Sequence, residues 1–229
     1  MDRSRPSDVT ARVALFADLL TRSEPPLDEL ALAVSAALQP TVDVTAVQAE
    51  LDRLAEACPT PTRDGVITHL FGSGHFQGDR RTYGHWHNSC LDHVVARRLG
   101  MPITLSVVAI EVARRLGVEL AGVGMPGHFL VGDPADPNWY ADPFHGTTGL
   151  DPAACRSLLT KLGVDGWSAA FLAVTPPRQV VARILNNLHA SCVQSGDRVR
   201  VAIVLQLRQQ LPQFAGEAPA AHDALAVFN

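Results

Sequence analysis

The sequence predicts an α+β fold in which a buried helix packs on a small antiparallel sheet and further helices lie on both sides. Three observations support this prediction. Residues 102–116 form a run that is apolar on nearly all faces of a helix, as expected in a core. Short strand-like segments separated by turn-forming residues follow in 119–144. Apolar residues recur at helical spacing in 8–58 and again in 176–211.

Composition indicates one large globular unit. The chain has 229 residues, of which 47% are hydrophobic and 18% charged, enough apolar material for one core with small helical additions. The net charge is −4 and the isoelectric point is about 6.1, and no Lys/Arg cluster is interleaved with aromatic residues. The sequence therefore lacks the electrostatic pattern of a nucleic-acid-binding protein.

The same composition predicts a cytoplasmic protein that does not enter a membrane. Arg12 and Asp18 interrupt the first apolar stretch, unlike the continuous apolar region of a signal peptide. No apolar run is long enough to span a bilayer. The cysteines form no Cys-x-x-Cys pair and no dense framework, which is typical of reduced thiols; they are Cys58, Cys90, Cys155 and Cys192.

Three helices are expected in the N-terminal segment, residues 1–60. Pro25 and Pro26 end the first, Pro40 ends the second, and Asp43 is expected to cap the third. The segment 66–80 is predicted to begin as a short helix and to continue as a glycine-rich loop.

A further helix is predicted over residues 87–100, with Asn88 or Ser89 as its cap, so that Cys90 would lie in its first turn. Pro102 suits the first turn of the buried helix that follows. The strands 119–124, 128–133 and 138–144 should then form an antiparallel meander.

The C-terminal third is predicted to be helical. Asp151 and Pro152 begin one helix in a cap-then-proline arrangement, and residues 176–212 read as a helical hairpin. We therefore divide the chain into the N-terminal segment, a core at 61–175, the hairpin, and a tail. The tail, 213–229, lacks strong periodicity, and part of it is expected to be disordered.

Two residues of the meander can work together chemically. His128 is expected to open the second strand and Asp142 to end the third, and side chains on one face of neighbouring antiparallel strands can meet. A carboxylate that orients a histidine base is part of a nucleophile–base–orienter triad. From spacing alone, a histidine held structurally by a carboxylate is the more frequent arrangement.

Several motifs together resemble a known family. The segment RTYGHWHNSCLDHVVARRLGMPITLSVV, the motif PGHFLVGD and the motif WYADPFHG are similar to the SirB-type bacterial branch of the transglutaminase-like superfamily. The resemblance implies a papain-like, transglutaminase-type core in which the nucleophile helix, the histidine strand and the aspartate strand follow in that order. It also implies that the C-terminal hairpin is similar to a tetratricopeptide-type helix pair, which would offer a surface for protein contacts.

One departure from that family pattern affects the chemistry. The helix-start position that holds the cysteine in most superfamily members falls here around residues 102–104, where there is no cysteine. Thr104 has a hydroxyl near the correct helix end, and Cys90 is the nearest thiol. For each there is a structural alternative, namely helix capping for Thr104 and a small buried apolar residue for Cys90.

Three functions remain open on this basis. The first is a hydrolase or acyltransferase acting on an amide or thioester, with Cys90 or Thr104 as nucleophile, His128 as base and Asp142 as orienter. The second is a non-catalytic scaffold that binds a peptide or protein partner in the same cleft. The third is a metal-binding protein, in which Asp142 or Cys90 joins a cluster of histidines, although no HExxH spacing is present; those histidines are His69, His75, His85, His87, His93, His128 and His145. No cofactor is expected.

Overall fold

The N-terminal helices begin and end at the breakers and caps that the sequence contains. The computed structural model describes residues 6–72 and 74–214. It has helices α1 (Pro6–Thr21), α2 (Leu27–Leu38) and α3 (Val44–Glu56). The Asp43 side chain accepts a hydrogen bond from the Ala46 amide, so the predicted cap of α3 is present.

The glycine-rich segment is more ordered than its composition predicts. Helix α4 (Arg63–Ile67) passes directly into a π-helical turn, η1 (Thr68–Gly72). Strand β1 (Gln77–Gly78) then pairs in parallel with β2 (Leu99–Gly100), which immediately precedes the buried helix. This pairing fixes the end of the loop against the core.

The prediction for the helix at 87–100 was partly wrong. A 3₁₀ turn, η2 (Trp86–Ser89), comes first, and the α-helix α5 (Leu91–Arg97) starts only after it. Cys90 has an extended backbone, with φ −104° and ψ 118°, because it joins the two helices. It therefore occupies the cap position of α5 and not its first turn.

The sheet contains the predicted meander and two more strands. The strands β3 (Ala121–Val123), β4 (Leu130–Asp133) and β5 (Asp136–Asp142) are antiparallel neighbours. The edge strands β6 (Thr147–Leu150) and β7 (Val174–Thr175) complete the order β6-β5-β4-β3-β7.

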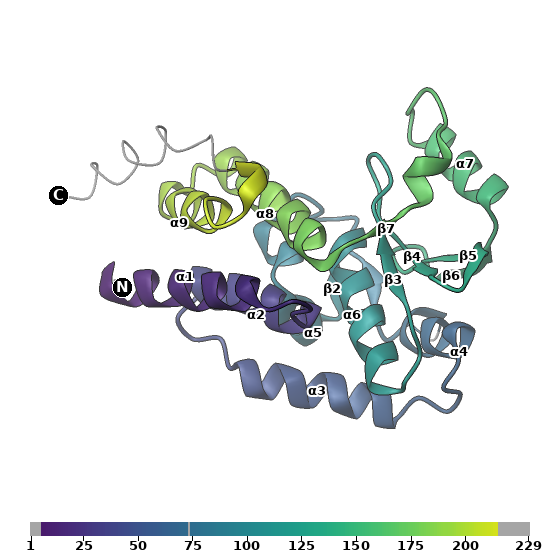
Figure 1. Cartoon of the computed structure of the whole chain (residues 1–229), viewed down its shortest axis with the longest axis horizontal. Helices are drawn as coiled ribbons and strands as arrows, with labels where there is room; N and C mark the ends of the chain where they lie inside the picture. The colour runs from purple at the N-terminus through teal and green to yellow at the C-terminus, as the bar shows by residue number, and fades with distance from the viewer. Residues whose placement is uncertain (1–5, 73, 215–229) are drawn as a thin grey trace.

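The remaining helices surround this sheet and the buried helix α6 (Pro102–Arg115). Helix α7 (Pro152–Lys161) packs on β5 and β6, and a short turn, η3 (Ala169–Leu172), leads to β7. The hairpin of α8 (Pro177–Gln194) and α9 (Arg198–Arg208) packs against α1 and α2, and η4 (Pro212–Phe214) follows it. Figure 1 shows the helical side and the sheet side meeting at α6.

One main hydrophobic core runs from α1 through α6 to α9 and includes the fully buried Phe16, Leu105 and Leu188. A smaller cluster lies between the sheet and α7, around Leu130 and Leu159. The predicted α+β fold, a buried helix on a small antiparallel sheet, is confirmed. None of the described helices is long and apolar enough to cross a membrane. Residues 215–229 of the predicted tail lie outside the described residues.

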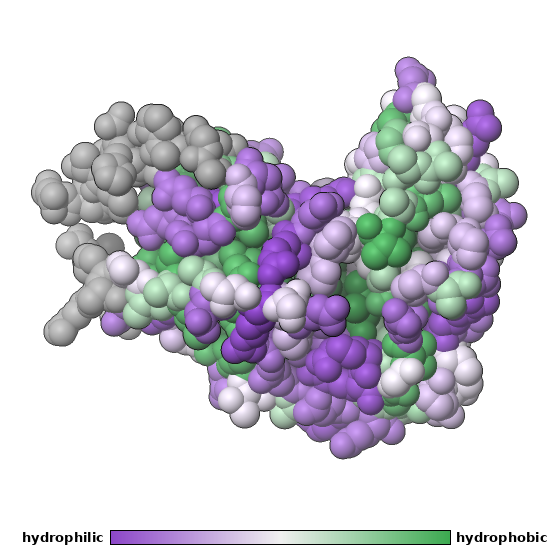
Figure 2. All heavy atoms as spheres, viewed as in Figure 1, coloured by the Kyte–Doolittle hydropathy of each residue, from purple (hydrophilic) through white to green (hydrophobic). Residues whose placement is uncertain are grey.

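Figure 2 shows a hollow between the side formed by α8 and α9 and the side formed by α7. Hydrophobic side chains, in green, face this hollow from the α7 side.

Candidate functional site

The structure brings His128 and Asp142 together at the end of β5. The His128 Nε2 atom lies 2.8 Å from Asp142 Oδ2, and both residues are buried. Asp142 is the last residue of β5, as predicted. His128 does not open β4 as predicted but lies two residues before it, in the β3–β4 connection.

A tight turn after β5 fixes the Asp142 carboxylate. Its Oδ1 atom accepts hydrogen bonds from the backbone amides of Phe144, at 3.0 Å, and His145, at 3.3 Å. The Oδ2 atom, which contacts His128, is also within hydrogen-bond distance of a second histidine, because His145 Nδ1 lies 2.7 Å from it. One carboxylate thus accepts hydrogen bonds from two backbone amides and two imidazole rings.

This arrangement determines which ring nitrogens carry protons. Burial of the Asp142 carboxyl acts to raise its pKa, but the hydrogen bonds and charges of His128 and His145 outweigh burial and hold that pKa below its usual value. An ionised carboxylate only accepts hydrogen bonds, so each facing nitrogen must donate. In the neutral form of each ring the lone pair is then on the other nitrogen, which is Nδ1 in His128 and Nε2 in His145.

Arg183 of α8 holds the loop that carries His128. Its guanidinium donates to the backbone oxygens of Met125 and His128, both at 3.0 Å, and lies over the Phe129 ring at 5.2 Å. The C-terminal hairpin thus contributes directly to the geometry of the site. Arg183 was not identified from the sequence. The one indication was that an arginine stands next to the buried Ile184 on an apolar helix face.

An aromatic group stands beside the pair. The Phe144 ring is edge-on to His128, with centroids 6.2 Å apart, and edge-on to Tyr83 at 5.9 Å. Phe144 and His145 both come from the turn that Asp142 fixes. The turn therefore places one aromatic ring and one imidazole around the carboxylate.

The structure does not bring Cys90 to this site. Its side chain is fully buried, and burial, followed by the negative charge of Asp92, raises the thiol pKa well above its usual value despite a hydrogen bond with Ser35. Within residues 6–72 and 74–214, no hydrogen bond joins Cys90 to His128. A neutral, enclosed thiol is a poor nucleophile.

The Thr104 hydroxyl is also engaged elsewhere. It donates to the Asn88 carbonyl oxygen at 2.6 Å and accepts from the Met101 amide at 3.3 Å. The contact with Met101 belongs to the N-terminal capping box of α6, and the contact with Asn88 ties α6 to η2. Neither residue proposed as nucleophile therefore has a hydrogen bond to His128 in the part of the chain described.

The other five histidines of the predicted cluster lie outside the group of His128, Asp142 and His145, and two of them, His69 and His75, lie edge-on to each other with ring centroids 5.2 Å apart. His85, His87 and His93 gather around Trp86, with ring centroids 4.3 Å apart for His85 and His87 and 4.0 Å for His87 and His93. Arg200 of α9 lies 3.8 Å above the Trp86 ring.

Within the described residues, one group of three potential metal ligands lies close together. It consists of His128, Asp142 and His145. The ligand atoms of these three all lie within 4.8 Å of one another. Two imidazole nitrogens and a carboxylate oxygen suit a transition metal. The nitrogen–oxygen distances of 2.7 and 2.8 Å are those of hydrogen bonds, so a metal would have to displace both protons.

The histidine group at Trp86 predicts a pH-dependent stability. Burial lowers the pKa of His87 to about 4, and neighbouring positive groups add to the shift. His87 therefore takes up a proton near pH 6.5, the ordinary pKa of histidine, in the unfolded state, but only near pH 4 in the folded state. We expect the free energy of unfolding, measured by urea titration, to fall as the pH decreases between these values.

The variant His87→Gln should lose part of this pH dependence, because it removes the group that protonates on unfolding. His75→Gln, an exposed histidine outside the Trp86 group, serves as the matched control and should behave as the wild type. An unchanged slope in His87→Gln would contradict the assignment.

Comparisons with known proteins identify related chains. The family model described as Transglutaminase-like superfamily matches residues 26–186. A UPF0162 protein of Xylella fastidiosa is 41% identical over 131 residues, covering 55% of this chain and 47% of that protein. A UPF0162 protein of Pseudomonas aeruginosa is 28% identical over 220 residues, covering 91% and 79% respectively.

A shorter match joins the chain to F-box only protein 21 of Homo sapiens, 39% identical over 62 residues, which is 27% of this chain and 10% of that protein. The chain spans about half the length of the first Xylella relatives it matches, 47% in each case. No solved structure matches the chain.

Proposed function

The chain belongs to the transglutaminase-like superfamily, and from this premise we propose that it is a non-catalytic member that binds a peptide or protein segment beside His128 and Asp142. The observation that carries the proposal is that neither of the two candidate nucleophiles, both of which lie in the described part of the chain, is available to His128. Cys90 is fully enclosed with a raised thiol pKa, and the Thr104 hydroxyl is bonded to the Asn88 carbonyl. The helix start that would face the histidine begins with Pro102.

Retention of the His128–Asp142 pair fits a binding site as well as an active site. In this chain the carboxylate organises the turn that carries Phe144 and His145. Those two residues line a cavity of about 450 Å³ that opens to solvent. A preformed cavity with aromatic walls and a few polar groups is typical of ligand sites.

The alternative is a hydrolase or acyltransferase that uses Cys90. It would require the thiol to leave its enclosed position at Ser35 and to reach His128. We also keep as proposals the SirB-type placement, a cytoplasmic location, and the use of the tetratricopeptide-like hairpin as a protein contact.

The reactivity of Cys90 distinguishes the two functions. In the folded protein, iodoacetamide at neutral pH should leave Cys90 unmodified, and a peptide thioester should leave no acyl adduct on it, because the thiol is neutral and enclosed. Peptide mapping by mass spectrometry should detect alkylation of Cys90 only after denaturation. Cys58, which is 9% exposed, provides an internal comparison in the same digest.

Rapid alkylation of Cys90 in the folded state that disappears in His128→Ala would overturn the proposal in favour of the enzyme. For the binding function itself, peptides selected from a displayed random library should bind the wild type. They should lose affinity for Gly78→Val, because a side chain there would meet the Phe144 ring that lines the cavity, 2.5 Å from the new Cβ.

A further inference from the structure

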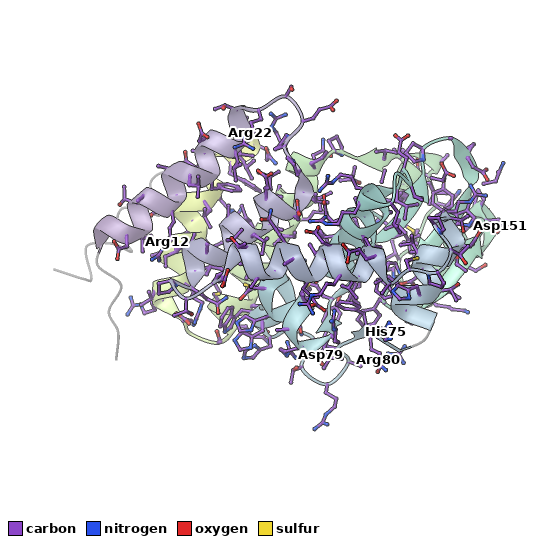
Figure 3. The ribbon with its side chains drawn as sticks, turned by 90° about the horizontal axis from the view of Figure 1, so that it is seen from below. Arg12, Arg22, His75, Asp79, Arg80 and Asp151 are labelled. Atoms are coloured by element: carbon purple, nitrogen blue, oxygen red, sulfur yellow. The ribbon has the colours of Figure 1, made fainter. Side chains whose placement is uncertain are left out.

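The cavity beside His145 contains two arginines that form no ion pair with any residue that the structure describes. Asp79 lies in its wall together with aromatic, glycine and basic residues, which include Phe71, Phe76, Gly78, Arg80, Arg81 and Phe144. Figure 3 shows Arg80 close to Asp79 and His75 at one edge of the molecule. His145 contributes to the cavity while its Nδ1 atom is bonded to Asp142, so the cavity adjoins the histidine–aspartate site.

Asp79 shapes the loop but does not neutralise these arginines. Its Oδ1 atom accepts from the backbone amides of Arg81, at 3.1 Å, and Thr82, at 2.9 Å. Its Oδ2 atom forms an ion pair with Arg97 at 2.9 Å. Burial acts to raise the pKa of Asp79, but hydrogen bonds from Thr82 and Arg97 lower it far more, so the carboxylate is ionised and already paired.

The guanidinium groups of Arg80 and Arg81 are left without a carboxylate. Neither forms an ion pair with any residue in 6–72 or 74–214, and the Arg80 guanidinium lies over the Phe144 ring at 5.9 Å. This absence is not explained by a shortage of acids, because the chain has a net charge of −4. The loop therefore presents two free positive charges on an acidic protein, next to an aromatic wall.

We propose that this cavity binds a carboxylate-bearing peptide segment, with the carboxylates paired to Arg80 and Arg81 and an apolar side chain against Phe144. Arginine pairs with carboxylates through two parallel hydrogen bonds, which gives the cavity a specific anion geometry. The Phe144 ring adds an apolar contact that free inorganic anions cannot use. This inference rests on the proposed function and names the class of ligand for it.

The probe is a fluorescein-labelled, amidated peptide that contains the sequence Glu-Phe-Glu, and fluorescence anisotropy measures its binding to the full chain. The double variant Arg80→Gln/Arg81→Gln should bind it about ten- to a hundredfold more weakly, as expected for the loss of two charge-assisted pairs. Both arginines are exposed and form no ion pair within the described residues, so the melting temperature should not change. Binding by the wild type should also weaken with added salt.

Arg156→Gln is a control for the loss of one positive charge elsewhere, since Arg156 is exposed on α7 and lies outside the cavity. It changes net charge in the same direction and should retain wild-type affinity. A Gln-Phe-Gln peptide should bind weakly to all variants. The corresponding peptide with a free carboxyl terminus distinguishes side-chain carboxylates from a terminal one, because tighter binding would assign the terminal carboxylate to the arginines.

Two results would overturn the inference while leaving the proposed binding function intact. One is equal affinity for the Glu and Gln peptides, and the other is an equal loss in Arg156→Gln. Efficient competition by inorganic phosphate without any contribution from the phenylalanine would indicate a general anion site and would overturn the peptide assignment. If library-selected peptides also fail to bind, the proposed function fails with the inference.

Discussion

Arg115→Ala should destabilise the protein by about 3 kcal/mol, at the lower end of the range for breaking a buried ion pair. The Arg115 guanidinium donates to Asp28 at 2.7 Å and to Glu111 at 3.0 Å. Both carboxylates are 1% exposed. Without Arg115 the Asp28 and Glu111 carboxylates would lie close together in the core between α2 and α6. Arg114 would neutralise their charge only in part.

A second contact makes this cluster important for the fold. The Glu111 Oε1 atom accepts from the Leu27 amide at 3.0 Å, and Leu27 is the first residue of α2. The buried helix therefore holds the N-terminus of α2 in two ways, through the Glu111 carboxylate and through the Arg115–Asp28 ion pair. Urea unfolding should measure the loss, and Arg114→Ala, whose side chain is 52% exposed, should cost about 1 kcal/mol or less.

The pH dependence of Arg115→Ala gives an independent check. Burial, followed by the charge of Asp28, already raises the pKa of Glu111. Removing Arg115 should raise it further, so the folded variant accepts a proton more readily than the unfolded chain. The destabilisation relative to wild type should then shrink as the pH decreases towards 5. A penalty that is constant with pH would show that lost packing, and not charge, causes the effect.

Local signals in the sequence predicted much of this fold. Asp43 and Asp151 cap the helices that they were expected to cap, because a side-chain acceptor at the N-cap is a local interaction. The short edge strand β7 was missed, because its two residues are held by pairing with Gly122 and Val123, some fifty positions earlier in the chain. Such pairing leaves no periodic pattern to read.

For the site, too, the sequence predicted some contacts and not others. Strand alternation was sufficient to place His128 near Asp142, although the histidine lies in a connection and not in the strand. The sharing of Asp142 by His145 depends on a turn geometry that spacing alone does not specify. The contact from Arg183 arises from the packing of α8 on the β3–β4 connection, which is purely tertiary.

Asp142→Ala should have the largest effect at the site, about 3–5 kcal/mol of stability together with loss of peptide binding. The substitution removes the acceptor of four donors, of which two are backbone amides and two are the rings of His128 and His145. His128 is 5% exposed, so its ring nitrogen has little access to water as a replacement partner. Phe144 would also lose the turn that places it in the cavity wall.

Asp142→Asn separates a positioning role from a catalytic one. The amide oxygen can still accept from the backbone of Phe144 and His145, while the ring nitrogens must adjust their protons to the amide group. If Asp142 positions the cavity wall, the Asn variant should recover most of the stability and most of the affinity for the Glu-Phe-Glu peptide. A catalytic orienter would behave differently, because Asn would change the tautomer of His128 and abolish turnover while the fold remained intact. Recovery of peptide affinity in Asp142→Asn, with Cys90 unreactive in both proteins, is therefore the combination that the binding function requires.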